Sequence, residues 1–372
     1  MIDGLHIRNS DREIIGYLDG FTSVIWHAVY YGVGDFEIYT RLTPEILDIL
    51  QIGNYVTRET RDDVGIIEAI NISYDASDGY MITATGRFAK SLLDRRLIYS
   101  LSGYTITPVT SYGNVEAAAR ALVKSSIISA TDTARNVSFI ELGDLAGLSA
   151  TIIDDDGDAA YKQTSYGNLL DYTDNLLKEY GYSAKIVLNL ETLNLQYVVF
   201  EGTDRTIGTA EPLIFSQEFD NLLSSDYTDD VTNLKNTAFC GGEGEGTDRK
   251  FVLVTSGDTG LNRREIFVDG SSQSQTYTDE SGEQQSYTDA EYLGMLKTAA
   301  SAGLTEYVET ISLDGDVDLT TGTLIFGVDY DVGDVVTVEE CNLGVYINTR
   351  ITEITEVQDE SGYSVKVSFE ND

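Results

Sequence analysis

Acidic side chains are the most abundant groups in this chain that could do chemistry. The sequence holds 62 Asp and Glu residues against 24 Lys and Arg residues. The densest run, Asp154-Asp155-Asp156-Gly157-Asp158, could offer oxygen ligands to Ca²⁺. A calcium-binding helix-loop-helix needs a Glu at the end of its loop, and Gln163 stands at that position. A solvated acidic loop is therefore the preferred interpretation.

A second acidic group alternates along the chain. Asp314, Asp316 and Asp318 would lie on one face of a strand, because strand side chains alternate between faces. Like charges on one face repel, so this face either binds a cation or meets water. Water is the preferred interpretation.

Residues for nucleophilic or zinc chemistry are few. His6 and His27 are the only histidines, and neither lies in a cluster with metal-ligand spacing. The chain has no Gly-x-Ser-x-Gly elbow, although a Ser-His-Asp arrangement built by the fold stays open. Paired carboxylates for glycoside hydrolysis carry little information in so acidic a chain. No convincing catalytic constellation follows from the residues.

Two further clusters have structural interpretations. The run Gly241-Gly242-Glu243-Gly244-Glu245-Gly246 is typical of a β-turn, since it lacks the Lys-Ser/Thr of a phosphate loop and its glutamates would repel phosphate. Lys90, Arg95 and Arg96 form a local basic cluster. They either pair with neighbouring carboxylates such as Asp94 or form an ion pair between subunits.

The whole-chain composition excludes several classes of protein. A net charge of −38 disfavours binding to phosphate backbones, so the acidic surface is either simply solvated or lines a passage that DNA crosses without sticking. Cys240 and Cys341 are too few for a disulfide framework, which indicates a reducing site of folding. No apolar run approaches a membrane span, and the N-terminus lacks a signal peptide. We expect folding in a cytoplasm and no stable membrane insertion.

The elements that position these residues are mainly strands. The 24 Tyr and 3 Pro residues, with recurrent Thr and Val, favour β structure, and residues 1–100 predict strands with Pro44 in the first turn of a short helix. Helical spacing predicts helices over 115–128, 168–180 and from 288 to about 300, the second ended by Gly181. Residues 185–190 and 195–200 predict a hairpin.

One pattern occurs near both ends of the chain. Gly53, Ile70 and Gly79 lie in similar β-type surroundings to Gly333, Ile354 and Gly362, and the offsets are 280, 284 and 283 residues. A stable offset indicates a duplicated β-unit with other segments inserted between or inside the copies. The second copy would be interrupted, with early strands near 216–287 and late strands at the C-terminus. Two such units in each chain would let a trimer imitate six-fold symmetry.

The run from Thr85 to Ile98, Thr-Gly-Arg-Phe-Ala-Lys-Ser-Leu-Leu-Asp-Arg-Arg-Leu-Ile, resembles the signature of a family of phage proteins. The family is that of the tail-tip or baseplate hubs of long-tailed bacteriophages, the siphovirus Gp37-like tail proteins, which are related to hub proteins of contractile tails. Its late Gly-Asp-x-Val strand is matched by Gly333-Asp334-Val335-Val336. Further matches touch both ends and the centre of the chain: Trp26, 34–38, 65–68, 241–246, Arg249, 263–265 and 349–353.

The resemblance implies a structural virion protein of the tail tip, assembled in the host cytoplasm. Related hubs form homotrimers with two β-barrels per subunit, and the pseudo-hexameric ring encloses the DNA passage during genome ejection. Implied partners are the distal tail protein or tail tube protein, the tape measure protein and a tail fibre or spike protein, with double-stranded DNA in transit. The resemblance implies no catalytic residues, no metal and no cofactor.

The expected fold is mainly β with α+β insertions. The segments are a first β-barrel hub domain over 1–108, an α+β module over 109–215, the first part of the second barrel with a polar loop over 216–287, a helical insert over 288–320 and the end of the second barrel over 321–372.

Two other classes of function stay open. A peptidoglycan hydrolase would need an added module, which in tail-tip proteins is usually a C-terminal extension. A glycan-binding adhesin would use aromatic side chains of the 109–215 module as platforms, although tyrosines at helical spacing more often pack in a core. The candidate platforms are Tyr161, Tyr166, Tyr172, Tyr180 and Tyr182.

Overall fold

The structure of the chain is a computed structural model. It describes residues 2, 4–102, 105–107, 109–152, 161–164, 167–219, 221–222, 224–278, 282–317, 324–341 and 344–370. The chain divides into two compact units. Unit 1 comprises residues 1–226 and 313–372, and unit 2 comprises residues 227–312. The five segments expected from the sequence are finer than this division and stay a prediction.

Unit 1 begins with a β-unit that we call copy 1, whose five strands are hydrogen-bonded in the order β5-β6-β7-β4-β3. Their bounds are β3 Ser23–Val29, β4 Asp35–Arg41, β5 Tyr55–Arg58, β6 Val64–Asp75 and β7 Gly79–Phe88. Two further strands, β1 (Leu5–Arg8) and β2 (Ile14–Leu18), continue the sheet beyond β5. The short helix α1 (Pro44–Ile49) starts at Pro44 as predicted, because the Thr43 side chain caps it by accepting from the Ile46 amide.

A second β-unit, copy 2, has its strands in the corresponding order β24-β25-β26-β23-β17. Their bounds are β17 Ser224–Asp230, β23 Thr310–Val317, β24 Val335–Glu340, β25 Val345–Asp359 and β26 Gly362–Glu370. The sequence order of the five strands is also the same in both copies. The chain of unit 2 leaves from β17 and returns at β23, so it is inserted where copy 1 has the turn between β3 and β4.

The two copies agree in their register as well as in their strand order. β6 bulges at Glu68 where it pairs with β7, and β25 bulges at Thr352 where it pairs with β26, an offset of 284 residues (352 − 68). Gly53 (φ +89°) and Gly333 (φ +95°) both take left-handed backbone angles, which glycine adopts without strain. The Gly53 amide donates to the Ile67 carbonyl at 2.8 Å, and Gly333 repeats this bond to Ile351 at 2.7 Å. The structure therefore confirms the predicted duplication, although only β17 of the strands expected near 216–287 belongs to copy 2, and β18 to β22 lie in unit 2.

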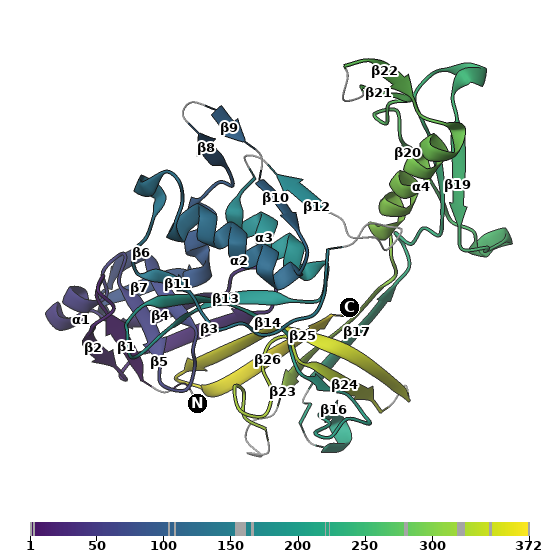
Figure 1. The fold of residues 1–372 in the computed structure, drawn as a ribbon. Coiled ribbons are helices and arrows are strands. Elements are labelled where there is room, and N and C mark those ends of the chain that lie inside the picture. The colour runs from purple at the N-terminus through teal and green to yellow at the C-terminus, as the bar shows by residue number, and fades with distance from the viewer. Residues whose placement is uncertain are drawn as a thin grey trace. The chain divides into compact units, whose positions relative to one another are not determined.

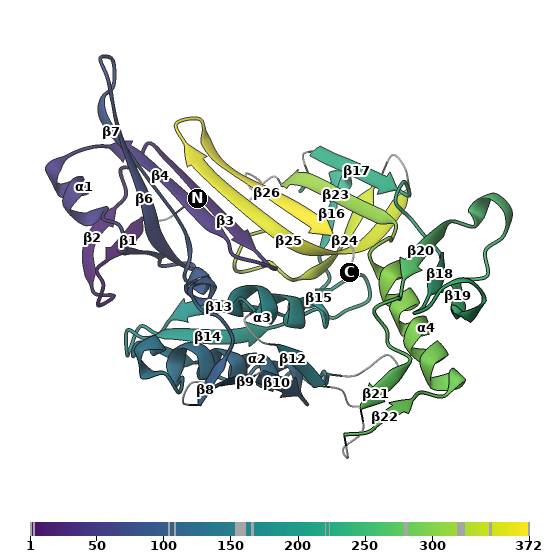
Figure 2. The same cartoon turned by 90° about the horizontal axis from the view of Figure 1, so that it is seen from above.

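The copies join directly, because β3 of copy 1 pairs antiparallel with β25 of copy 2. The pairs run from Val29 with Glu353 to Val24 with Gln358. Figure 2 shows the strands of both copies side by side in one sheet. Within the part of the chain that the structure describes, the pairings do not close either copy into a barrel. The mainly β fold with helical insertions is confirmed, whereas two separate barrels stay a prediction.

The α+β part of unit 1 is a three-stranded sheet with two helices packed on it (Figure 1). The sheet order is β11-β14-β13, with bounds β11 Ile140–Leu142, β13 Ser183–Leu188 and β14 Leu195–Phe200. The hairpin of β13 and β14 and the helix α3 (Leu169–Lys178) are where the sequence predicted them. Asn168 caps α3, and Gly181 follows it with φ +72°. The helix α2 (Val115–Val123) passes into a π-helical turn over Lys124–Ile128.

Short elements complete unit 1. A 3₁₀ helix over Ala89–Arg95 follows β7, as the helical character after Arg87 predicted. β15 and β16 pair with β24, β8 pairs with β9, and β10 pairs with β12. Their bounds are β8 Ser100–Ser102, β9 Thr105–Thr107, β10 Val109–Tyr112, β12 Tyr161–Thr164, β15 Asp204–Arg205 and β16 Ile214–Ser216. Other 3₁₀ turns lie at Thr133–Arg135, Gln217–Phe219, Gly246–Asp248 and Gly260–Asn262.

Unit 2 is a small sheet covered on one face by a helix. Its strands are in the order β19-β18-β20, with bounds β18 Thr237–Gly241, β19 Phe251–Thr255 and β20 Glu265–Asp269. A hairpin of β21 (Thr276–Thr278) and β22 (Gln284–Ser286) lies in the predicted polar stretch. The helix α4 (Asp289–Thr305) begins where predicted, with Thr288 and Glu291 forming a reciprocal capping box. Of the helices that the structure describes, none has the length and hydrophobicity of a membrane span.

Candidate functional site

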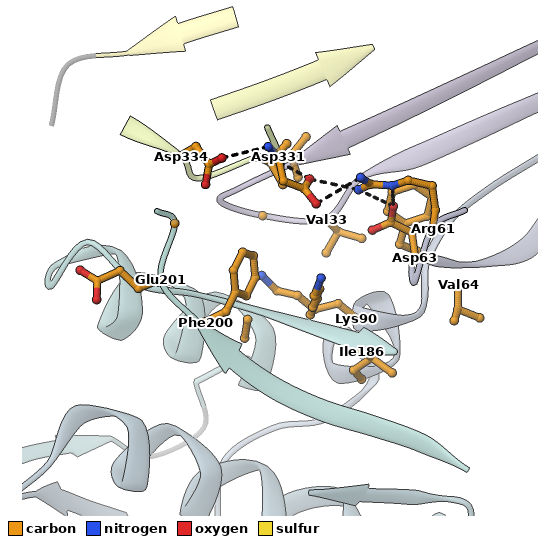
Figure 3. Close-up of a pocket in the computed structure, with 18 of the residues that line it drawn as sticks. Val33, Arg61, Asp63, Val64, Lys90, Ile186, Phe200, Glu201, Asp331 and Asp334 are labelled. Atoms are coloured by element: carbon orange, nitrogen blue, oxygen red, sulfur yellow. Dashed lines mark hydrogen bonds and ion pairs between the residues drawn. The ribbon is translucent and has the colours of Figure 1, made fainter. Parts of the chain in front are cut away.

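Buried charges gather where copy 1, copy 2 and the α+β sheet of unit 1 meet. A cavity of about 200 Å³ lies there. Figure 3 shows its lining, in which Arg61 faces Asp63 and Asp331, with Lys90 and Phe200 also on the wall. We call the charged residues of this region the junction network: Arg58, Arg61, Asp63, Lys90, Asp174, Asp331, Asp334 and Glu356.

Arg61 is the centre of the junction network. Its guanidinium binds Asp63 at 2.9 Å and, from the other copy, Asp331 at 3.1 Å, while its side chain is 4% exposed. The ring of Phe326 lies 3.9 Å below the guanidinium. Burial would lower the pKa of Arg61, but the two carboxylates raise it overall. Arg61 therefore stays charged and joins segments 270 residues apart.

The two carboxylates of Arg61 respond differently to their surroundings. Burial favours the protonated form of Asp63, but Arg61 and Lys185 lower its pKa overall, and the indole of Trp26 donates to it at 3.5 Å. Burial is the larger effect at Asp331 and raises its pKa even though Arg61 opposes this.

A second buried ion pair joins the strands of the two copies. Arg58 of β5 and Glu356 of β25 are both 3% exposed and form a two-pronged contact, in which the longer bond is 3.3 Å. The Tyr363 hydroxyl donates to the same carboxylate at 2.5 Å. The guanidinium of Arg58 also lies 5.5 Å from the Trp26 ring. Both charges and the carboxylate oxygens thus have partners inside the protein.

Asp334, in the predicted late Gly-Asp-x-Val strand, organises the backbone around the network. Its carboxylate accepts from the amides of Thr203 at 2.8 Å and Asp331 at 3.1 Å, and from Arg205 Nε at 2.9 Å. Asn54 occupies the equivalent backbone position in copy 1, since Ile67 donates to Asn54 as Ile351 donates to Asp334. The motif therefore fixes a turn and carries no chemistry of its own.

The basic cluster predicted at residues 90–96 is divided by the fold. Lys90 is buried and pairs with Asp174 of α3 at 2.7 Å, so the hypothesis of an inter-subunit ion pair is wrong for Lys90. Burial lowers the pKa of Lys90 and raises that of Asp174. Arg95 contacts Glu68 at 3.5 Å, and Arg96 donates to the Arg135 carbonyl.

Asp94, the carboxylate expected to pair with the basic cluster, binds Arg87 of β7 at 3.2 Å instead. The Arg87 guanidinium also donates two hydrogen bonds, of 2.8 and 3.1 Å, to the carboxylate of the bulge residue Glu68. Arg87 of the signature run therefore fixes the bulge of β6 against the helical turn that follows β7.

The other predicted site residues do not converge. His6 lies 3.7 Å from Glu59, whereas His27 lies between Asp35 at 3.0 Å and Glu353 at 3.4 Å. Within the described residues, no three His, Cys, Asp or Glu side chains come together as metal ligands would. The run Asp154–Asp158, together with Tyr166 and Asp318, lies outside the described residues.

The aromatic and cysteine residues have structural surroundings where the structure describes them. Tyr182 is 6% exposed and packs in the core, so it is not a glycan platform. Tyr172 and Tyr180 are partly buried against the same core. Cys240 is buried and unpaired, and Cys341 is partly buried and unpaired.

The glycine-rich run of unit 2 is a turn, as predicted. Its amides bond within the protein: Gly242 donates to the Lys250 carbonyl and Glu243 donates to the Tyr292 hydroxyl. Arg249 closes the turn by donating to the carbonyls of Gly241 and Gly242. These amides are therefore not arranged to bind phosphate.

Unit 2 has an exposed apolar surface that the sequence analysis did not identify. One sheet face packs on α4, and the opposite face presents four side chains that are 42–52% exposed; we call it the aromatic face, Phe239, Phe251, Leu253 and Phe267. The rings of Phe239 and Phe251 stack with centroids 5.0 Å apart. The signal was present in the sequence, because these strands are apolar at successive positions, which is typical of strands covered on both faces.

The junction network can hold parts together but has no free reactive group among the described residues that we can assign to a reaction. Strongly perturbed pKa values mark active sites, but structural ion pairs perturb them too. Here Lys90, Arg61 and Arg58 each have a carboxylate partner within the chain. The junction network holds the two copies and the α+β part of unit 1 together. The aromatic face is the clearer candidate for binding another protein.

Comparisons with known proteins agree with this reading of the fold. A model of the family described as siphovirus ReqiPepy6 Gp37-like protein matches residues 4–369. The search of curated proteins gave no match. The tail protein from Neisseria meningitidis MC58 is 12% identical, with a TM-score of 0.60 over 99% of this chain and 96% of that chain. The 43 kDa tail protein of prophage MuSo2 from Shewanella oneidensis is 14% identical, with a TM-score of 0.59 over 99% and 98%. Prophage tail protein gp18 from Listeria monocytogenes EGD-e is 15% identical, with a TM-score of 0.52 over 100% and 95%. At these identities the three structures show a shared fold.

Proposed function

Since the chain belongs to the siphovirus ReqiPepy6 Gp37-like family, we propose that this structural protein of the phage tail is the homotrimeric hub of the tail tip. Three chains carry six β-units, which match a six-fold tail tube or distal tail ring. The ring of β-units encloses the passage through which DNA leaves during ejection.

The observation that carries this proposal is the duplication within one chain. Copy 1 and copy 2 share strand order, register and a bulge. The junction network fixes the copies to each other through buried charge pairs, which set geometry more than they add stability. A rigid pair of similar units is what a symmetry adaptor needs, because each pair must present two equivalent surfaces at a fixed spacing.

Unit 2 supports the second half of the adaptor role. The β-unit occurs twice in each chain, whereas unit 2 occurs once, inserted in copy 2. A trimer therefore presents unit 2 three times. We assign its aromatic face to a three-fold tip component, a fibre or spike protein, that covers Phe239 and its neighbours with apolar side chains. The tape measure protein would end at the same hub.

The proposal includes an acidic passage and no catalysis. The net charge of −38 supports loops rich in Asp and Glu facing the lumen, which repel the DNA backbone. The described charged groups of the junction are paired within the chain, which supports a purely structural role. A cleared zone on cell-wall substrate would contradict that role, and a neutral or basic lumen would contradict the acidic passage.

A reconstruction of the tail tip tests the whole proposal. We expect three copies of this chain in one ring of six β-units, with a tip component bound to each of the three copies of unit 2. A tail without a three-fold ring position for this chain would refute the hub. The mass of the purified chain is a weaker test, because assembly can require contact with the tube.

A further inference from the structure

The outer half of β6 has an open edge. β6 pairs with β7 along its length but with β5 over Val64–Ile66, so beyond the bulge at Glu68 the described strand pairings leave one edge without a partner strand. Figure 2 shows the tip of the β6–β7 hairpin extending beyond β1 and β2. Ile72 is 46% exposed and Tyr74 is 65% exposed there. An open edge with apolar side chains is a template for strand addition.

The equivalent edge in copy 2 is occupied. The residues of β25 beyond its bulge, from Glu353 to Gln358, pair with β3. The contact starts at the bulge itself, where the Tyr30 amide donates to the Thr352 carbonyl at 2.7 Å. Thr352 corresponds to Glu68. The β3–β25 pairing therefore shows that this edge accepts an antiparallel strand of the β3 type.

The corresponding strand to fill the β6 edge is β17. β17 has the place in copy 2 that β3 has in copy 1, at the end of the sheet next to β23. Among the described strands it pairs with β23 and with no second strand. β17 of copy 2 thus corresponds to β3, and the open edge of β6 in copy 1 corresponds to the edge of β25 that β3 occupies.

We propose that β17 of one molecule pairs antiparallel with Glu68–Asp75 of β6 in a second copy of this chain. The contact repeats the internal β3–β25 joint between molecules. It is heterologous, because two different surfaces meet, and such contacts make a ring when the rotation closes. The inference rests on the proposed hub and identifies its subunit interface.

Charge opposes this contact until it is screened. β17 carries Asp226, Asp229 and Asp230, and the β6 edge ends in Asp75. Acidic edges keep free molecules from pairing at random. Added salt screens exposed carboxylates, so assembly should strengthen as ionic strength rises.

Proline at Ile72 tests the pairing without breaking the hairpin. The bond from Tyr30 to Thr352, with antiparallel alternation, makes Ile354, Glu356 and Gln358 the residues whose amides face β3. Their equivalents in β6 are Ile70, Ile72 and Tyr74. An Ile72→Pro substitution therefore removes an outward amide and leaves the bonds to β7 in place.

The experiment combines native mass measurement with hydrogen exchange on the full chain, at low and high salt. We expect an oligomer in which the Ile70, Ile72 and Tyr74 amides are protected. Ile72→Pro should raise its dissociation constant by at least about tenfold. Ile72→Thr, which keeps the amide, is the matched control and should assemble within about threefold of the parent. Trp26 fluorescence shows whether each variant is folded.

The outcomes separate the interface from the function. An oligomer whose β6 amides exchange freely, or an Ile72→Pro variant that assembles like the parent, overturns the β17–β6 contact and leaves the hub standing. A chain that stays monomeric at every protein and salt concentration overturns a β17–β6 contact that forms without the tube, and the tail map alone then decides the hub. The hub itself fails on a different result, the absence of a three-fold ring of this chain in the tail map.

Discussion

Removing the carboxylate of Glu356 should strongly destabilise unit 1. In a Glu356→Leu variant the Arg58 guanidinium, 3% exposed, would keep its charge in the protein interior without the Glu356 carboxylate that balances it. The Tyr363 hydroxyl would lose its acceptor as well. Breaking a buried ion pair from one side costs about 3–5 kcal/mol. At 1.4 kcal/mol for each factor of ten, this is a shift of about a hundredfold to a few thousandfold in the unfolding equilibrium.

The loss of stability in Glu356→Leu should come from the unbalanced charge of Arg58 and not from a change in side-chain packing. Leucine is similar in size to glutamate, and copy 1 already has an apolar residue, Ile72, at the equivalent position of its strand. The double variant Arg58→Met, Glu356→Leu removes both charges. Apolar replacement of a whole buried pair is often neutral or stabilising. We therefore expect the double variant to recover most of the stability lost by Glu356→Leu.

Urea unfolding followed by Trp26 fluorescence is the assay. Trp26 is the single tryptophan, is fully buried in copy 1 and lies beside Arg58, so its signal reports on unit 1 and not on unit 2. The matched control is Asp62→Asn, which breaks the exposed pair with Lys185 and should cost less than about 1 kcal/mol. If Glu356→Leu costs no more than Asp62→Asn, or if the double variant is as unstable as the single one, the reasoning is refuted.

Three further predictions concern acid stability, the buried Lys90–Asp174 pair and the aromatic face. Asp63 has a lowered pKa in the folded chain, so its contribution to the stability of the fold is present above its ordinary pKa of 3.8 and is lost as pH falls through the folded value. Asp63→Asn should therefore reduce the loss of stability at low pH, measured by a pH titration of Trp26 fluorescence. An unchanged loss of stability at low pH would contradict this prediction. Replacing both Lys90 and Asp174 by Met and Leu should change the free energy of unfolding by less than about 1 kcal/mol or raise it, whereas Lys90→Met alone should cost about 3–5 kcal/mol in the same urea assay. Phe239→Ser should leave the Trp26 transition unchanged but reduce the fibre or spike content of purified tails, and tails of normal composition would remove the aromatic face as its attachment site.

The sequence predicted local features of this fold well. The duplication could be predicted because the turns at Gly53 and Gly333 need a left-handed backbone angle, which glycine adopts without strain. The helix α3 was visible because Asn168 and Gly181 mark its two ends. These signals are short-range, since a cap or a turn is specified by residues a few positions apart.

The junction network could not be predicted in the same way. Arg58 and Glu356 are 298 residues apart, and nothing in a single sequence says which distant charges will meet. A lysine is ordinarily exposed, so the sequence predicted that Lys90 pairs with a neighbouring carboxylate such as Asp94 or with another subunit, whereas the fold buries it beside α3. The strands of copy 2 were hard to assign for a related reason, because unit 2 separates β17 from β23.

The joint between β3 and β25 also has a consequence for how the protein is made. Val29 and its partner Glu353 are 324 residues apart (353 − 29). At about 5–20 residues per second, the ribosome needs roughly 15–65 s to synthesise the segment between them. During that interval copy 1 can fold while the edge of β3 has no partner from its own chain. Nascent chains on one messenger could then pair with each other, and we expect slow translation of the C-terminal half to increase aggregation and a host chaperone to reduce it.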